Sequence, residues 1–378
     1  MRAIDRLFEH EPFDYSAEGL RLQLEAFQEA FALQYEGCAE YRRLCDHRGF
    51  RPGDLVRREQ LSDIPAVFVG VLKERDLLSV PVERVTRTFT SSGTGGRVSR
   101  ICLDQPSFDR VVRSARNVYA ALGMVAPEQE VNYLCFSYDP AKAAEVGTSF
   151  TDDLLTSFTR RHDVFFTLRW DDKLGEFRFD REGSLERLEQ YELQGLPTRL
   201  LGFPAFIHDL LEEGVARRGK SFALPPDSWV LTGGGWKGRA DEAISKRGFA
   251  AQVAGWLGIP QASVRDLYGM VEHGIPYVDC ARQNLHVPLY AHLTARSPAT
   301  MEALGDGETG LLEFRTPYLT SYPSYSLLTT DLGRLHAGCE CGLAGPVVEL
   351  LGRGGVKKHK GCALTAAELY LGSREGKR

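Results

Sequence analysis

The hydrophobic and polar positions of this 378-residue chain follow two alternating periods, one typical of helices and one typical of strands. Apolar residues three and four positions apart predict helices, and short β-prone runs between them predict strands. This alternation indicates a largely parallel α/β core. The predicted helices cover residues 16–49 (one or two helices), 106–122, 185–193, 204–213 and 240–257. The predicted strands cover residues 85–90, 131–137, 164–168, 199–202, 229–232 and 264–268.

The pattern changes after about Leu285, where shorter strands are predicted at 287–290, 310–314 and 326–329. A short buried run at 67–72 follows Ile64-Pro65 near the other end. The chain is too long for one small core, so two subdomains or one large α/β unit are expected.

Composition narrows the classes of function. The contents of 43% hydrophobic and 26% charged residues are those of a globular protein, and a net charge of −5 argues against nucleic-acid binding. No apolar run approaches the ~18 residues of a membrane span, and the acidic N-terminus does not resemble a signal peptide. We therefore expect a cytoplasmic protein whose eight cysteines are mostly reduced.

Residues 88–97 break abruptly from a β-prone run into hydroxyls and glycines. Glycines permit positive φ, so successive backbone N–H groups can converge on phosphate oxygens, with Arg97 or Arg100 neutralising the charge. The alternative is a flexible Ser/Gly turn between strands. The candidate phosphate-binding residues are Ser91, Ser92, Gly93, Thr94, Gly95 and Gly96.

Two further glycine-containing motifs follow predicted strands. Gly233-Gly234-Gly235 would let a planar ring lie against backbone, although a tight turn explains it equally well. In Tyr268-Gly269-Met270-Val271-Glu272, Tyr268 can stack on a base and Glu272 can hold Mg²⁺. Glu272 is otherwise an ordinary acid at a helix start.

Two motifs near the C-terminus complete the series. Asp331, expected at a strand end before Gly333, can accept hydrogen bonds from both ribose hydroxyls, although Asp-Leu-Gly is also a common turn. Residues 351–362 concentrate glycines and cations around Arg353 and then present Cys362. Neighbouring cations favour thiolate, the nucleophilic form, so Cys362 is a candidate nucleophile rather than an idle thiol.

Taken in order from about Pro65 to the C-terminus, these motifs resemble the adenylate-forming superfamily of acyl-CoA synthetases, adenylation domains and luciferases. The resemblance implies that the Ser/Thr/Gly loop binds the ATP phosphates, that Tyr268 and Glu272 contact adenine and Mg²⁺, and that Asp331 binds ribose. It implies the N-terminal α/β core of that family: mainly parallel sheets with flanking helices and a smaller β region. In the family, a Gly-Arg pair such as Gly352-Arg353 leads into a C-terminal lid.

Only 25 residues follow Arg353 here, so a truncated lid without its catalytic lysine is expected. The expected domains are a core at 1–350, with a helical part at about 1–60, and a stub at 351–378. Lys357, Lys358 or Lys360 would replace the lid lysine. Val271 stands where many relatives carry Ser or Thr, and Gly354-Gly355 replaces an acidic hinge pair.

Within the superfamily, Leu72-Lys73-Glu74, Gly233-Gly234-Gly235-Trp236-Lys237 and the C-terminal Lys-Gly-Cys-Ala-Leu-Thr are similar to the acyl-protein synthetases of bacterial bioluminescence. Phenylacetate–CoA ligases are the next most similar branch. The resemblance implies that a carboxylic acid, in this branch a fatty acid, is activated as acyl-AMP. The acyl group then moves to Cys362 and on to an acyl reductase partner.

Two rival functions stay open at this point. One is a ligase that passes acyl- or aryl-AMP to CoA, an amine or a carrier protein, and the other is a retired nucleotide-binding module. The candidate acyl-pocket residues are apolar, and apolar clusters also form ordinary core. They are Phe203, Trp236 and Met270.

A separate pattern concerns metal. Cys280 and His286 precede Cys339-Glu340-Cys341, and three thiolates with one imidazole would form a tetrahedral structural Zn²⁺ site. His336 competes as the fourth ligand, and free cytosolic thiols are the alternative.

Overall fold

The computed structural model describes residues 1–90, 99–139, 147–236 and 243–354, with the backbone alone at 147–150. The chain folds into two compact units. Unit 1 is built mainly from Met1–Leu122, Gly269–Val278 and residues 284–354, and unit 2 mainly from Gly123–Tyr268. In the part of the chain that the structure describes, no helix has both the length and the hydropathy needed to cross a membrane.

Unit 2 contains the mostly parallel sheet expected from the sequence. Its strands lie in the order β9-β8-β7-β4-β5-β6. Every pairing in this series is parallel except that of β5 with β6, which is antiparallel. The strands are β4 (Ala126–Tyr138), β5 (Thr159–Asp171), β6 (Glu176–Phe179), β7 (Thr198–Gly202), β8 (Trp229–Gly233) and β9 (Val264–Tyr268).

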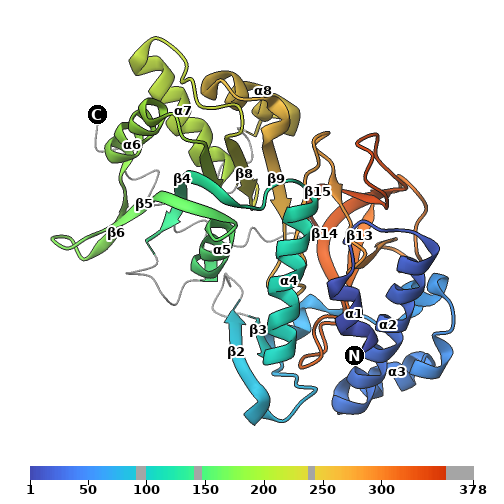
Figure 1. The fold of residues 1–378 in the computed structure, drawn as a ribbon. Helices are drawn as coiled ribbons and strands as arrows, with labels where there is room; N and C mark the ends of the chain where they lie inside the picture. The colour runs from blue at the N-terminus through green and yellow to red at the C-terminus, as the bar shows by residue number, and fades with distance from the viewer. Residues whose placement is uncertain (91–98, 140–146, 237–242, 355–378) are drawn as a thin grey trace. The chain divides into compact units, whose positions relative to one another are not determined.

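The helices of unit 2 are α5 (Gly147–Thr156), α6 (Arg181–Gln194), α7 (Pro204–Arg218) and α8 (Lys246–Leu257), with a 3₁₀ turn at Gln261–Ser263. Figure 1 shows α6, α7 and α8 grouped near the strands β4, β8 and β9 of the sheet. Leu188, Leu210 and Val253 of these helices share one buried cluster with strand residues such as Leu200 and Val230. Removal of this apolar surface from water holds the layers together.

Unit 1 combines N-terminal helices with an antiparallel sheet. The sheet order is β11-β15-β14-β13-β12, with β1 added in parallel to β14. A separate hairpin joins β2 to β3. The strands are β1 (Val67–Phe68), β2 (Val85–Thr90), β3 (Arg100–Asp104), β10 (Tyr277–Val278), β11 (Leu285–His286), β12 (His292–Arg296), β13 (Gly310–Arg315), β14 (Ser326–His336) and β15 (Val347–Arg353).

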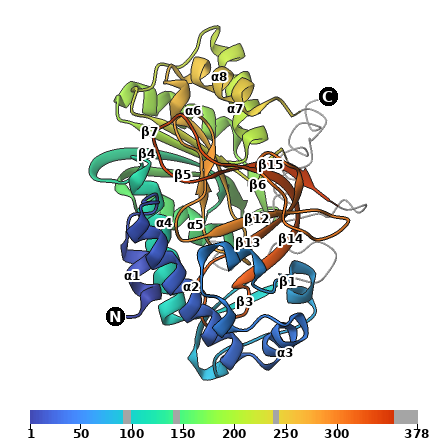
Figure 2. The same ribbon diagram turned by 90° about the vertical axis from the view of Figure 1, so that its right-hand side faces the viewer.

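The helices of unit 1 are α1 (Ala3–Glu9), α2 (Ala17–Gly37), α3 (Ala39–Arg48) and α4 (Gln105–Ala121), with 3₁₀ turns at Pro52–Asp54, Arg58–Asp63, Val69–Lys73 and Val82–Arg84. Side-chain caps start two of them: Ser16 accepts from the Gly19 N–H, and Asp104 accepts from the Ser107 N–H. In both views α1 lies beside α2 and α4 (Figures 1 and 2).

Most predicted elements are confirmed, with three corrections. Residues 287–290 are not a strand, because Pro288 lacks an N–H and the Leu289 N–H donates to the Pro12 carbonyl instead. Within the described residues, the helix predicted from 240 begins only at Lys246, where the Ser245 hydroxyl accepts from the Gly248 N–H. The run at 67–72 was expected to be buried, but Phe68 and Val71 are 45% and 39% exposed, because the run forms only the two-residue β1 followed by a 3₁₀ turn.

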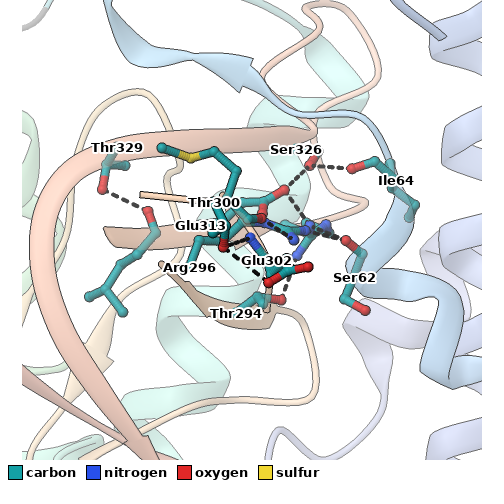
Figure 3. Close-up of polar contacts among 12 residues, drawn as sticks. Ser62, Ile64, Thr294, Arg296, Thr300, Glu302, Glu313, Ser326 and Thr329 are labelled. Atoms are coloured by element: carbon teal, nitrogen blue, oxygen red, sulfur yellow. Dashed lines mark hydrogen bonds and ion pairs between the residues drawn. The ribbon is translucent and has the colours of Figure 1, made fainter. Parts of the chain in front are cut away.

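A buried ionic cluster ties the antiparallel sheet of unit 1 to the turn that precedes β1. Glu313 on β13 is 1% exposed and pairs with both Arg296 and Arg315, as Figure 3 shows for the Arg296 side. Arg315, 0% exposed, also donates to the Ser62 carbonyl at 2.9 Å, and the Ser326 hydroxyl donates to Glu313 at 3.3 Å. Buried charges require such partners, so this cluster fixes β12, β13 and β14 against one another.

Candidate functional site

The carboxyl ends of three parallel strands meet at one edge of the unit 2 sheet. Gly202 of β7 lies opposite Thr232 of β8, and Gly233 lies opposite Leu267 of β9. The predicted glycine run 233–235 therefore leaves the sheet beside Gly202 and Tyr268. Gly235 has φ +69° and no heavy atom within 4 Å of where a Cβ would stand, so its backbone is open on that side.

The same edge contains the switch point of the sheet. From β4 the chain continues to β5 on one side, whereas from β7 it continues to β8 on the other. Open α/β sheets bind ligands outside the carboxyl ends of strands at such points. Gly202, with φ +154°, packs here so closely that a Cβ would lie 2.4 Å from that of Phe136. The backbone of β7 thus approaches β4 at a place that only glycine allows.

A partly buried polar chain beside this edge was not foreseen from the sequence. The Thr232 hydroxyl donates to Asp266 at 2.9 Å, and the Asp266 N–H donates to Asp279, which Lys246 contacts at 2.6 Å. Burial, followed by the charge of Asp279, raises the pKa of Asp266 to about 6. The available signal was the pair of charged residues, Arg265 and Asp266, within the short strand 264–268.

In unit 1, the turn after Tyr268 presents Glu272. The His273 and Gly274 N–H groups donate to the Met270 carbonyl at 3.1 and 2.8 Å, which closes the turn. Gly274 has φ +74°, and a Cβ there would lie 2.3 Å from the Tyr318 hydroxyl, so the turn packs directly on that ring. Glu272 is 7% exposed, and after burial its charge is the next cause that raises the pKa of Tyr318.

The residue after Glu272 anchors the turn. His273 is fully buried, stacks on Tyr277 with an interplanar angle of 12°, and shares a 2.6 Å hydrogen bond with its hydroxyl. Burial lowers the pKa of His273 to about 3, so the ring is neutral at physiological pH. The turn that carries the Glu272 carboxylate is therefore rigid, and an acid that binds a metal ion needs such support.

Asp331 and Arg353 form an ion pair across two neighbouring strands of unit 1. The residues are in register on β14 and β15, and Arg353 Nε donates to Asp331 Oδ1 at 2.9 Å. The prediction that Asp331 ends its strand is wrong, because β14 continues to His336. The register shifts at Leu332/Gly333, where a Cβ on Gly333 would lie 2.5 Å from the Glu349 carbonyl oxygen. The acid thus lies just before a bulge, a feature enriched next to active sites.

The candidate acyl-pocket residues lie in ordinary packing environments. Trp236 is half-buried, with its ring edge-on to Phe249 at 6.1 Å, and Phe203 meets Phe206 at 5.5 Å. Both pack against the core cluster of unit 2. Met270 is half-buried in the Glu272 turn. A role for these three in binding the acid stays a prediction.

The four predicted metal ligands are brought together. Sγ of Cys280, Cys339 and Cys341 and a ring nitrogen of His286 all lie within 4.8 Å of one another. His336, the competing ligand, instead lies 3.5 Å from Glu349.

Several predicted site residues lie outside the described residues. They are Ser91, Ser92, Gly93, Thr94, Gly95, Gly96, Arg97, Lys357, Lys358, Lys360 and Cys362. Arg100, the alternative cation, is described: it is exposed and lies 3.7 Å from Asp76.

Comparison with known proteins decides the family. The model of the acyl-protein synthetase family, LuxE, matches residues 2–370. The chain belongs to this family. It is a ligase of the acyl-protein synthetase type, as the sequence motifs predicted.

Curated relatives of the family match over nearly the whole chain. The long-chain-fatty-acid–luciferin-component ligase of Vibrio harveyi is 25% identical over 376 residues, which is 98% of this chain and 94% of that protein. The enzyme of the same name from Aliivibrio fischeri is 24% identical over 373 residues, 97% and 93% of the two chains. Among solved structures, 2-hydroxyisobutyryl-CoA ligase in the postadenylation state has a TM-score of 0.68 at 16% identity, covering 95% of this chain and 74% of that one. The fold is therefore that of adenylate-forming CoA ligases.

Proposed function

We propose that this chain activates a fatty acid with ATP as acyl-AMP, transfers the acyl group to its own Cys362, and delivers it to an acyl reductase partner. The observation that carries the proposal is the family match, which extends to residue 370 and so includes the segment with Cys362. The names of the two Vibrio and Aliivibrio relatives, ligases of a long-chain fatty acid, support the substrate class.

Each unit offers groups suited to nucleotide binding. In unit 2, the open backbone at Gly235 and the ring of Tyr268 stand at the switch-point edge, where an adenine can lie against glycine and stack on an aromatic ring. In unit 1, Asp331 would accept from the ribose hydroxyls while Arg353 holds its carboxylate in place. The Ser91–Gly96 loop with Arg97 would receive the phosphates.

Glu272 would hold Mg²⁺ in this scheme. The fit is reasonable because Mg²⁺ in nucleotide sites is bound by one or two carboxylates together with substrate phosphates. Glu272 supplies one such carboxylate on a turn buried against Tyr318. When bound, the ion neutralises phosphate charge during displacement at phosphorus.

The chemistry then needs two displacements. A carboxylate oxygen of the acid bonds to the α-phosphorus of ATP, and pyrophosphate leaves. The Cys362 thiolate next bonds to the acyl carbon, and AMP leaves with the electron pair of the broken C–O bond. Lys357, Lys358 or Lys360 would supply positive charge in both steps, lowering the pKa of the thiol and stabilising phosphate oxygens.

Isotope exchange between pyrophosphate and ATP, measured with a series of fatty and aryl acids, tests the first step. We expect acid-dependent exchange that is greatest with a fatty acid and is lost in Asp331→Asn. Exchange greatest with an aryl acid would point to the aryl ligase function instead. ATP binding without exchange for any acid would leave only a nucleotide-binding module.

A further inference from the structure

Three thiols and one imidazole lie close together, and the imidazole belongs to β11, which pairs with β15. Cys280 lies six residues before His286, which pairs with Val347 at the start of β15. Cys339 and Cys341 lie in the loop between β14 and β15. All four ligand atoms lie within 4.8 Å of one another, and Cys341 Sγ is 3.1 Å from His286 Nε2. Residues far apart in the sequence therefore bring their donor atoms close together.

From this convergence we propose that Cys280, His286, Cys339 and Cys341 bind one structural Zn²⁺ ion. The donor set is the reason for choosing zinc: soft thiolates and an imidazole select Zn²⁺, whereas Mg²⁺ and Ca²⁺ require oxygen ligands. With Zn–S near 2.3 Å and Zn–N near 2.0–2.1 Å, tetrahedral ligand atoms are separated by roughly 3.6 Å. The observed separations, from 3.1 Å to at most 4.8 Å, bracket that value.

The surroundings of the sulfurs fit thiolate ligands. The Arg282 N–H donates to Cys280 Sγ at 3.3 Å, the Leu343 N–H donates to Cys341 Sγ at 3.4 Å, and the Asn284 amide donates to Cys339 Sγ at 3.1 Å. Each sulfur thus accepts a hydrogen bond, which a thiolate does far better than a thiol. Outer hydrogen bonds of this kind orient metal ligands and tune their basicity.

The position of the ligands suits a structural ion. Four protein ligands fill a tetrahedral zinc shell and leave no open position for a substrate. Cys280 and His286 are 1% and 0% exposed, so the ion would be enclosed on that side. The ion would fasten the β14–β15 loop to β11, and so brace the two strands that carry Asp331 and Arg353. This inference does not depend on the acyl-transfer chemistry.

Elemental analysis of the full chain, purified without added metal, tests the proposal. We expect about one zinc ion per chain in the wild type, and loss of that zinc in Cys341→Ser. Cys102→Ser is the matched control: Cys102 is a half-buried free thiol on β3 outside the cluster, and its removal should leave the zinc content unchanged.

A second measurement covers the case in which Cys341→Ser does not fold. Co²⁺ exchanged into the wild-type chain should give the visible absorption of a tetrahedral thiolate complex, and added Zn²⁺ should abolish that absorption. Chelation of the metal should also lower the thermal unfolding temperature. The proposal is overturned if wild-type protein holds no zinc and gives no such cobalt spectrum, or if a folded Cys341→Ser variant retains the full zinc content.

Discussion

At the scale of single residues, Asp331 is the acid proposed to bind ribose, and Arg353 orients it. The Asp331 side chain is 11% exposed, whereas the Arg353 side chain is 70% exposed, so the pair presents a guanidinium to solvent and keeps a carboxylate in a fixed orientation. Exposed pairs of this type contribute at most about 1 kcal/mol to stability. The value of the pair therefore lies in orienting the acid that is proposed to bind ribose.

Arg353→Ala should accordingly raise the KM for ATP about 10-fold, the equivalent of one lost charge-assisted hydrogen bond. Its free energy of unfolding should change by less than about 1 kcal/mol. Steady-state pyrophosphate release and urea unfolding measure the two effects. Arg334→Ala, which removes an exposed arginine 3.9 Å from Glu349 on the same pair of strands, should change neither. An unchanged KM in Arg353→Ala would contradict the proposed role.

Glu272 carries a second prediction at this scale. Glu272→Gln keeps the shape of the side chain but removes its charge, so pyrophosphate–ATP exchange should fall about 100-fold and should require more Mg²⁺. ATP binding measured without Mg²⁺ should be unaffected. Glu308→Gln, at an exposed acid of the same unit, is the control. Equal losses in both variants would remove the case for Glu272 as a magnesium ligand.

Asp266 gives a prediction about pH. Its pKa in the folded protein is raised to about 6 from an ordinary value of 3.8. Stability from this group is therefore complete below pH 3.8 and is lost as the pH rises through about 6. Asp266→Asn mimics the neutral acid and still accepts from Thr232, so its stability relative to wild type should increase from pH 4 to pH 6 and then level off.

Urea unfolding across that pH interval measures this difference. Asp172→Asn, at an exposed acid of the same unit, should show no comparable change. A relative stability of Asp266→Asn that is flat with pH would show that the Asp266 pKa is not raised in the folded protein.

At the scale of elements, the cluster around Glu313 determines how β12, β13 and β14 are fixed. Removing one partner of a buried ion pair leaves charge without compensation. Glu313→Gln would leave the guanidinium groups of Arg296 and Arg315 without the carboxylate that pairs with them. It should therefore lower the free energy of unfolding by about 3–5 kcal/mol. Glu349→Gln, whose partners are exposed, should cost less than about 1 kcal/mol. Similar losses in the two variants by urea unfolding would contradict this role.

Some helices and strands could be predicted from the sequence alone, and others could not. The strand at 264–268 was predicted with its observed bounds, because the β-prone Val264 and Tyr268 delimit a short run with a clear end at Gly269. The buried run at 287–290 failed as a strand, because its burial comes from a long-range contact with Pro12 that no local pattern contains. Local periodicity reports which residues are buried, but not the element against which they are buried.

In the candidate site too, features with a local sequence signal were predicted, and features that depend on strand pairing were not. The turn at Glu272 and the glycine run at 233–235 follow strand ends that the sequence marks clearly. The bulge after Asp331 depends on how β14 pairs with β15. The sequence therefore predicted that Asp331 lies on a strand, but it predicted the wrong end for that strand. Glu313 and Arg315 were missed, although two charged residues two positions apart in an apolar strand share one face and require buried partners.

At the scale of the whole molecule, the proposed chemistry draws on groups from both units and on a segment near the C-terminus. The phosphate loop and Cys362 lie outside the described residues, so their roles rest on the motifs and on the family match over residues 2–370. The central claim is that the acyl group becomes bound to this chain. Only detection of the covalent product tests that claim directly.

The decisive measurement is the intact mass of the protein after incubation with ATP, Mg²⁺ and a mixture of fatty and aryl acids. We predict a hydroxylamine-labile adduct whose mass identifies a fatty acyl group in the wild type and in Cys102→Ser. The adduct should be absent from Cys362→Ser, which should still catalyse pyrophosphate–ATP exchange. Release of pyrophosphate by the wild type with no adduct, or an adduct that persists in Cys362→Ser, would contradict transfer to Cys362.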